Sequence, residues 1–113
     1  FNQLENIKIN QLVFNADGLI PTVIQEQSTK EILMVAYSNE NSLELTMKTN
    51  KCHFWSRSKK KIWLKGETSG NFLKLFNIYV DCDNDTLIFE VNLEGTGACH
   101  TGTKTCFFKK LES

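Results

Sequence analysis

The 113-residue sequence has few of the features that mark specialised classes of protein. It contains one proline, no stretch close to the roughly 18 apolar residues of a membrane-spanning helix, and no segment typical of a signal peptide. Its 13 basic and 13 acidic residues cancel, which argues against nucleic acids or membrane surfaces as partners. We therefore expect a single cytoplasmic domain over residues 1–113, with an ordinary 41% hydrophobic content.

Arginine is nearly absent, because Arg57 is the only arginine among the 13 basic residues. Its guanidinium is a rigid fork of hydrogen-bond donors that lysine cannot reproduce. All the remaining basic residues are lysine, which suggests that position 57 needs the donor geometry of arginine. Drift in composition is the alternative explanation.

Cysteine is also scarce, since four in 113 residues are too few for a disulfide framework. Cys99 and Cys106 are separated by glycine and threonine residues and resemble metal ligands of a cytosolic protein. Cys52 lies beside bulky aromatic residues, where a free thiol packs as a small hydrophobic group.

Runs of β-branched and alternating apolar residues predict a protein dominated by strands. The last of these runs alternates most clearly, with Ile88, Glu90 and Asn92 between the apolar positions. The expected strands are Pro21 to Gln27, Ile32 to Tyr37, Cys52 to Ser56, Ile62 to Lys65, the segment with Phe76, Ile78 and Val80, and the segment with Leu87, Phe89, Val91 and Leu93.

One main helix is expected at about residues 39–49, after the second strand. Ser38 or Asn39 can cap its start, and Asn50 is a suitable end. Leu43 and Met47 lie on one face of this helix. The fold class is therefore α+β, with a largely antiparallel, twisted sheet and a glycine- and threonine-rich loop from Gly95 to Cys106.

Three of the four aspartates, Asp81, Asp83 and Asp85, fall within five residues at the expected connection between two antiparallel strands. Asp and Asn are common in turns because their side chains bond to the nearby backbone. Three carboxylates repel one another, however, unless a cation neutralises them. Oxygen ligands on a short turn suit Mg²⁺ or Ca²⁺, so we favour a metal site over a solvated turn.

A second metal site can be built from thiolates, because Cys82, Cys99 and Cys106 supply three possible ligands for Zn²⁺. A structural zinc site uses four protein ligands, whereas a catalytic site commonly uses three and leaves a position for water. His100 or Cys52 would be the fourth ligand of a closed site. The spacing alone leaves the open and closed sites as alternatives.

Two polar runs follow expected strands, one from Trp55 to Ser58 and one from Lys65 to Asn71. Their hydroxyl groups, glycine amides and basic side chains are groups that bind phosphate. A solvated turn is the alternative for the second run. Stacking of nucleic-acid bases on Phe54 and Trp55 is another alternative, which the zero net charge opposes.

These runs together resemble the phosphoribosyl-AMP cyclohydrolase family, which opens the purine ring in histidine biosynthesis. The family also occurs as the N-terminal half of a bifunctional enzyme that carries a pyrophosphohydrolase domain. The matching segments are Asn15 to Pro21, Leu33 to Tyr37, His53 to Ser58, Lys65 to Asn71, Asp81 to Asp85, and Ala98 to Gly102 continuing to Cys106.

The resemblance implies two metals and an intertwined homodimer. Zn²⁺ is bound by Cys99 and Cys106 of one chain and by Cys82 of the partner chain. Mg²⁺ is bound by the three clustered aspartates Asp81, Asp83 and Asp85.

The resemblance also implies the reaction, which is hydrolysis of the N1–C6 bond of 1-(5-phosphoribosyl)-AMP by a zinc-activated water. His100, beside a zinc ligand, is the candidate proton carrier. Mg²⁺, Arg57 and Lys65 are expected to hold the two substrate phosphates. The full set of expected substrate-binding residues is Trp55, Ser56, Arg57, Ser58, Lys65, Glu67, Thr68 and Ser69.

A hypothesis from another class is a zinc-stabilised binding module without catalytic activity. Such a module would have a closed zinc site, with His100 or Cys52 as the fourth ligand. An open site, in contrast, binds a small anion or a chelator reversibly.

Overall fold

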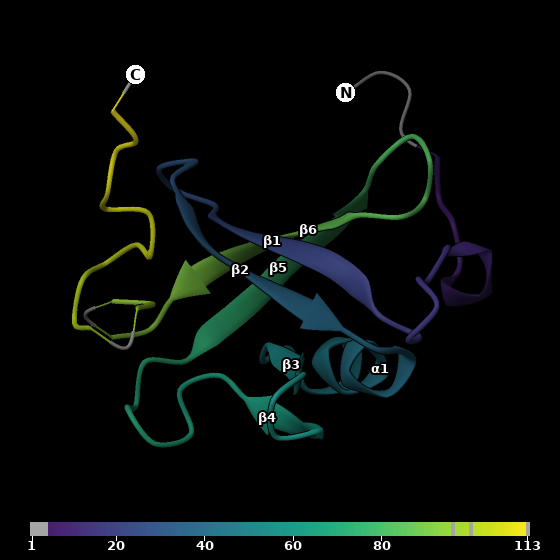
Figure 1. The fold of residues 1–113 in the computed structure, drawn as a ribbon, viewed down its shortest axis with the longest axis horizontal. Helices are drawn as coiled ribbons and strands as arrows, with labels where there is room; N and C mark the ends of the chain where they lie inside the picture. The colour runs from purple at the N-terminus through teal and green to yellow at the C-terminus, as the bar shows by residue number, and fades with distance from the viewer. Residues whose placement is uncertain (1–4, 96, 100, 113) are drawn as a thin grey trace.

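A computed structural model describes residues 5–95, 97–99 and 101–112 of the chain. Within these residues it has one sheet of six strands, one α-helix and one turn of 3-10 helix (Figure 1). In chain order the elements are η1 (Ile9–Gln11), β1 (Ile20–Glu26), β2 (Ile32–Ser38), α1 (Glu40–Thr49), β3 (His53–Ser56), β4 (Lys61–Leu64), β5 (Leu73–Val80) and β6 (Leu87–Leu93).

No helix in this part of the chain has both the length and the apolar character needed to cross a membrane.

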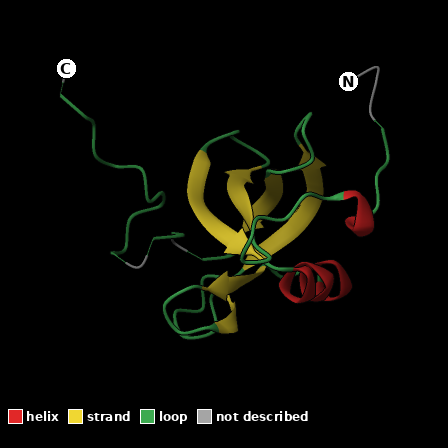
Figure 2. Ribbon diagram, turned by 45° about the vertical axis from the view of Figure 1, so that its right-hand side comes forward, coloured by secondary structure: helices red, strands yellow, loops and turns green. Residues whose placement is uncertain are grey.

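The strands lie in the order β4-β3-β2-β1-β6-β5. Every neighbouring pair is antiparallel except β1 and β6, which are parallel. The β5–β6 hairpin therefore joins the sheet beside the first strand and not beside β4. Figure 2 shows how strongly the sheet curls, with α1 beside it. These features confirm the predicted α+β class with a largely antiparallel, twisted sheet and one main helix.

The β1–β2 hairpin forms as expected, with buried residues at every second position of β1. Ile20 and Ile24 point into the core, and Thr22 lies between them on the same face. The buried Thr22 hydroxyl is satisfied by the Ser38 hydroxyl at 2.8 Å, so it carries no unpaired polar group into the core.

Helix α1 begins and ends at asparagines, as predicted. The Asn39 side chain accepts a hydrogen bond from the Ser42 backbone amide at 2.8 Å. Asn50 adopts the left-handed conformation with φ of 60°, and its amide donates to the Thr46 carbonyl at 2.9 Å. These two caps fix the helix between the second and third strands.

The predicted apolar face of α1 is only half correct. Leu43 is buried, but Met47 is 52% exposed. Thr46 takes the buried position instead, because its hydroxyl accepts from the His53 backbone amide at 2.8 Å and ties the helix to β3.

The core lies on the inner side of the curled sheet. Phe54 stacks against Phe89 at 5.8 Å and contacts Trp63 at 5.5 Å between ring centroids, which links β3, β4 and β6. The buried apolar cluster consists of Ile20, Ile24, Leu33, Met34, Leu43, Cys52, Phe54, Leu73, Leu87, Phe89, Val91 and Ala98.

The predicted alternation fails at one position of β5. Phe76 was expected on the core side with Ile78, but it is 51% exposed. The pairing register with β6 shifts between Leu75 and Asn77, as it does at a β-bulge, so Leu75 and Ile78 pack against the core instead.

The alternation also fails in β6, where Glu90 is buried rather than solvated. Its carboxylate is held by Lys30 Nζ at 2.8 Å and by Asn77 Nδ2 at 2.9 Å. Partners from two other segments therefore offset the cost of burying this charge.

Candidate active site

The turn between β3 and β4 carries the first group of predicted substrate residues. Trp55 pairs with Tyr37 of β2, and Arg57 Cζ lies 4.1 Å from the centroid of the Tyr37 ring. A cation in this position is attracted by the face of the ring. The Ser56 and Ser58 hydroxyls lie 3.4 Å apart on the same turn. The turn thus presents an oriented guanidinium and two hydroxyl groups.

The loop after β4 carries the second group. Lys65 is buried, and its backbone amide donates to the Cys52 carbonyl at 3.0 Å. Gly66 has φ of 95°, and a Cβ at this position would lie 2.6 Å from the Phe72 backbone nitrogen. The Gly70 amide donates to the Gly66 carbonyl at 2.8 Å and closes the loop. The exposed residues on this loop are Glu67, Thr68, Ser69 and Gly70.

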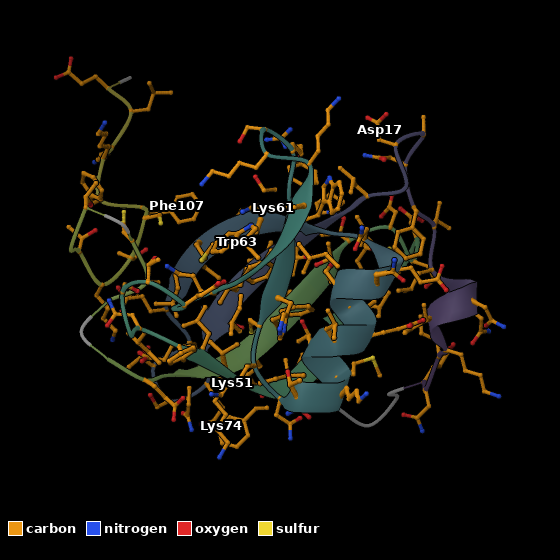
Figure 3. All side chains as sticks on the ribbon, turned by 90° about the horizontal axis from the view of Figure 1, so that it is seen from below. Asp17, Lys51, Lys61, Trp63, Lys74 and Phe107 are labelled. Atoms are coloured by element: carbon orange, nitrogen blue, oxygen red, sulfur yellow. The ribbon has the colours of Figure 1, made fainter. Side chains whose placement is uncertain are left out.

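These two groups meet at one cavity of about 340 Å³. Ser56 of the first group and Glu67 and Thr68 of the second group line it. Lys59 and Lys61 also line the cavity. The substrate residues predicted from the sequence do not include these two lysines, although their position directly after Ser58 was an available signal. Figure 3 shows the described side chains, with Lys61 and Trp63 of this wall labelled.

Cys99 and Cys106 lie on a compact loop that follows β6. The Cys99 amide donates to the Thr103 carbonyl at 3.2 Å, and the Gly102 amide donates to the Cys99 carbonyl at 3.0 Å. The Cys106 amide donates to the Leu33 carbonyl at 2.7 Å, which fastens the end of the loop to β2. The loop thus holds the two cysteines in fixed positions.

The environment of this loop favours a thiolate at Cys99. Hydrogen bonds from the Thr101 side chain and backbone, helped by Thr103 and Cys106, lower the pKa of Cys99 to about 6. The Cys99 Sγ lies 3.0 Å from the Thr101 hydroxyl. Burial and the neighbouring Cys99 raise the pKa of Cys106 to about 11, which the charge of Lys65 partly opposes. The two thiols therefore act on each other, and Cys99 is the more acidic of the pair.

The cysteine loop lies beside the loop of residues 65–71 (Figure 1). Gly95 has φ of 121°, and a Cβ there would collide with the Asn71 side chain. The charge of Lys65, which begins that loop, also acts on Cys106. The predicted phosphate-binding and zinc-binding runs thus meet at one end of the molecule.

The aspartates form the predicted tight turn between β5 and β6. The Asp85 amide donates to Asp81 Oδ1 at 3.0 Å. Partial desolvation raises the pKa of Asp81, but hydrogen bonds from the amides of Asp85, Thr86 and Asp83 lower it overall. A hydrogen bond to Asp81 and the charges of Asp81 and Asp83 raise the pKa of Asp85. The three carboxylates therefore act on one another as a cluster.

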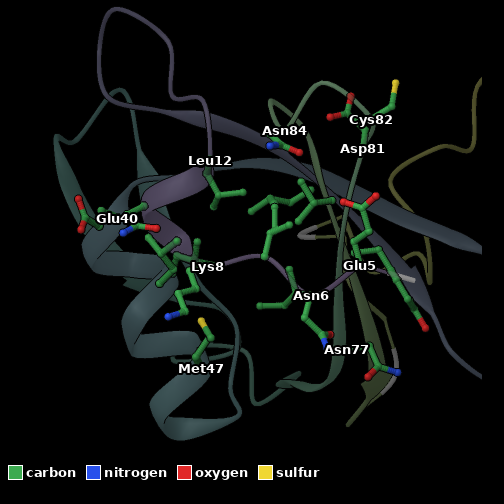
Figure 4. Close-up of a pocket in the computed structure, with 18 residues that line it drawn as sticks. Glu5, Asn6, Lys8, Leu12, Glu40, Met47, Asn77, Asp81, Cys82 and Asn84 are labelled. Atoms are coloured by element: carbon green, nitrogen blue, oxygen red, sulfur yellow. The ribbon is translucent and has the colours of Figure 1, made fainter. Parts of the chain in front are cut away.

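Cys82 is exposed on this turn, at the far end of β6 from the other two cysteines (Figure 1). β6 has seven residues, so its ends are separated by roughly 20 Å at about 3.3 Å per residue. Asp81 and Cys82 instead border a groove of about 1100 Å³ between the N-terminal segment, α1 and β5 (Figure 4).

The predicted metal ligands of one chain thus lie at opposite ends of β6, with the aspartate turn and Cys82 at one end and the Cys99–Cys106 loop at the other. Among the described residues, no three His, Cys, Asp or Glu side chains are placed to hold one metal ion. His100 lies outside the described residues. Cys52 is fully buried in the core, and burial raises its pKa to about 12, which disfavours the thiolate that a metal needs.

Comparison with known families identifies the chain. Residues 34–108 match the model of the phosphoribosyl-AMP cyclohydrolase family. The chain belongs to the phosphoribosyl-AMP cyclohydrolase family. The matched residues include the loop of residues 65–71, the cysteine loop and the aspartate turn at the opposite end of β6. The match confirms the resemblance inferred from the sequence.

Several relatives of this cyclohydrolase-family chain are close in sequence. It is 54% identical over 101 residues to the phosphoribosyl-AMP cyclohydrolase of Methanoregula boonei, covering 89% of this chain and 81% of that protein. It is 51% identical over 102 residues to the one from Archaeoglobus fulgidus, covering 90% and 94%. The histidine biosynthesis bifunctional protein HisIE of Aquifex aeolicus is 48% identical over 102 residues, which are 90% of this chain and 50% of that protein.

Proposed function

We propose that the chain hydrolyses the N1–C6 bond of 1-(5-phosphoribosyl)-AMP, a step of histidine biosynthesis. Family membership and the close relatives support this reaction. The observation that carries the assignment of the site is the meeting of the Cys99–Cys106 loop with Lys65 and the loop that it begins. The free thiols of the chain suit a reducing compartment, and we place the reaction in the cytoplasm.

The chemistry of the substrate explains why water adds at this carbon. The ribosyl group on N1 leaves the purine ring electron-poor, so C6 accepts a nucleophile readily. The N1–C6 bond then breaks and opens the ring. Zinc enzymes that deaminate adenine attack the same carbon and release ammonia instead.

Cys99 and Cys106 fit a zinc site by the chemistry of their side chains. Thiolates are preferred zinc ligands, and the lowered pKa of Cys99 supplies one thiolate near neutral pH. When bound, Zn²⁺ makes hydroxide available near neutral pH. His100 is next to Cys99 in the sequence and is our candidate to carry the proton released in this step.

We propose that the third thiolate is Cys82 of a second copy, since the separation along β6 prevents Cys82 of the same chain from reaching Cys99. A homodimer would also cover exposed apolar side chains next to Cys106. Phe107 is 59% exposed, Phe108 is 51% exposed and Leu111 is 92% exposed. Apolar groups gathered in this way commonly mark an interface.

The second copy would bring its aspartate turn to the same site. Asp81, Asp83 and Asp85 form a set of oxygen ligands that suits Mg²⁺. The mutual repulsion that raises the pKa of Asp85 would be relieved by a bound cation. Mg²⁺ there would neutralise a substrate phosphate next to the cysteines of the first chain.

The remaining proposed contacts hold the substrate in place. Arg57 and Lys65 would bind the two phosphates, and Lys59 and Lys61 add positive charge at the cavity that they share with Ser56 and Thr68. Fixing both ends of the substrate positions C6 for attack and lowers the entropic part of the barrier. Further contacts with the substrate are proposed for Trp55, Ser56, Ser58, Glu67, Thr68 and Ser69.

The test is a ring-opening assay on protein stripped of metals with a chelator. We expect no turnover of 1-(5-phosphoribosyl)-AMP without metal, turnover with Zn²⁺, and more with Zn²⁺ and Mg²⁺ together. AMP, which lacks the ribosyl group on N1, is the control substrate and should stay intact. A zinc-stabilised binding module would bind the nucleotide but would give no turnover under any of these conditions.

Replacing Arg57 by lysine should weaken substrate binding while keeping the charge. The change removes the fork and its stacking on Tyr37, so we expect a loss of about 1.5–3 kcal/mol, or roughly 10- to 150-fold in KM. Tyr37→Phe keeps the ring and is the control. An unchanged KM and kcat for Arg57→Lys would show that the single arginine reflects composition only.

A further inference from the structure

Lys104 joins the cysteine loop to the β1–β2 turn. Its Nζ lies 2.6 Å from Glu26 Oε1 and 3.1 Å from Glu31 Oε1. Glu26 is the last residue of β1 and is buried, while Glu31 is half-buried just before β2. Cys106, one of the two cysteines of the loop, lies two residues after Lys104 in the sequence.

The backbone of Lys104 also closes the loop that carries both cysteines. The Ala98 amide donates to the Lys104 carbonyl at 2.9 Å, directly before Cys99. On the other side, the Thr105 hydroxyl donates to the Ile32 carbonyl at 2.7 Å. The carbonyl of Lys104 thus holds the residue before the first cysteine, and its ammonium group adds ion pairs to the hydrogen bonds that fasten the loop to the hairpin.

A second buried glutamate, Glu90, offers a comparison in which the cation does not come from the cysteine loop. Glu90 lies on β6 beside β1 and is buried to a similar degree, 6% exposed against 8% for Glu26. Its partner is Lys30, which comes from the β1–β2 turn itself, at 2.8 Å. Glu26 already accepts from Thr29 on the same turn at 2.7 Å, yet its cation comes from the cysteine loop.

We infer that Lys104 is a positioning residue, which uses its ion pairs with Glu26 and Glu31 to hold the Cys99–Cys106 loop in its metal-binding form. This inference rests on the proposed zinc site. A loop held in place before the metal arrives loses less conformational freedom on binding. Groups that orient metal ligands typically change metal affinity 10- to 100-fold when they are removed.

The test compares two lysine-to-methionine variants by their zinc affinity. We expect Lys104→Met to weaken Zn²⁺ binding about tenfold in competition with a chromophoric chelator. Lys30→Met removes an ion pair of the same type, to an equally buried glutamate, without touching the loop. It should leave the zinc affinity within about twofold of wild type. Its melting temperature should fall by about as much as that of Lys104→Met. Lys104→Arg should restore the affinity.

Two further variants keep the outcome clear. Glu26→Gln removes the charge at the other end of the ion pair and keeps the shape of the side chain, and it should also weaken zinc binding. It therefore tests the same ion pair if Lys104→Met fails to fold. Equal zinc affinities for the Lys104→Met and Lys30→Met proteins, or for Glu26→Gln and wild type, would overturn the positioning role. Cys99→Ser separates this failure from that of the site itself: if it leaves zinc binding unchanged, the proposed zinc site is wrong.

Discussion

Mixing two inactive variants, Cys82→Ser and Cys99→Ser, is expected to restore about a quarter of the wild-type activity. If Cys82 of one chain completes the site of the other, each twofold dimer has two mixed sites. A heterodimer then has one site with both lesions and one with none. Random pairing after unfolding and refolding makes about half of the dimers mixed, and half of the sites in those dimers are intact.

The matched control is a mixture of Cys99→Ser and Cys106→Ser. Both lesions lie in the same half of the proposed site, so every site in the heterodimer keeps one broken ligand. This mixture should regain no activity, although its refolding and subunit exchange are the same. If the Cys82→Ser and Cys99→Ser mixture also regained nothing, the three cysteines would not be shared between chains.

The sequence predicts the local structure of this protein well, because those signals lie within a few residues. Asn39 and Asn50 mark the ends of α1, and the aspartate run marks the turn between β5 and β6. The loop that carries Cys99 and Cys106 was also predictable, since glycine and threonine residues between them favour a loop over a helix or strand.

What the sequence does not predict depends on pairing between distant segments. The parallel contact of β1 with β6 joins residues more than 60 positions apart, as in the pair Thr22 and Leu87. The same contact brings Glu90 beside the β1–β2 turn and buries it next to Lys30. The bulge that exposes Phe76 is likewise a property of the strand pair and not of either strand alone.

The candidate site has the same division. Site residues that are neighbours in the sequence, such as Ser56 and Arg57, were predicted from their motif. Tyr37 under the guanidinium and Lys104 on Glu26 were not, because each contact joins a loop to a strand far away in the chain. Their partners become visible only when the sheet order is known.

Gly66→Ala is expected to lower activity strongly, because it forces the loop after β4 to move. The residue has φ of 95°, where an L side chain costs about 1–2 kcal/mol. Its new Cβ would also lie 2.6 Å from the Phe72 backbone nitrogen and 2.7 Å from the Asn71 carbonyl carbon. Backbone atoms cannot turn away as a side chain can, so the loop must move.

That movement displaces Lys65, which is buried and whose charge acts on Cys106, and we expect kcat/KM to fall about 100-fold for a shift near 1 Å. Gly70→Ala is the matched control, since it has φ of 77° in the same loop but no atom within 4 Å of its new Cβ. It should lose about 1 kcal/mol of unfolding free energy and little activity. Urea unfolding and steady-state kinetics on both variants measure the difference. Equal losses of activity would mean that the close approach at Gly66 does not position Lys65, and that the loop tolerates the change by moving away from the site.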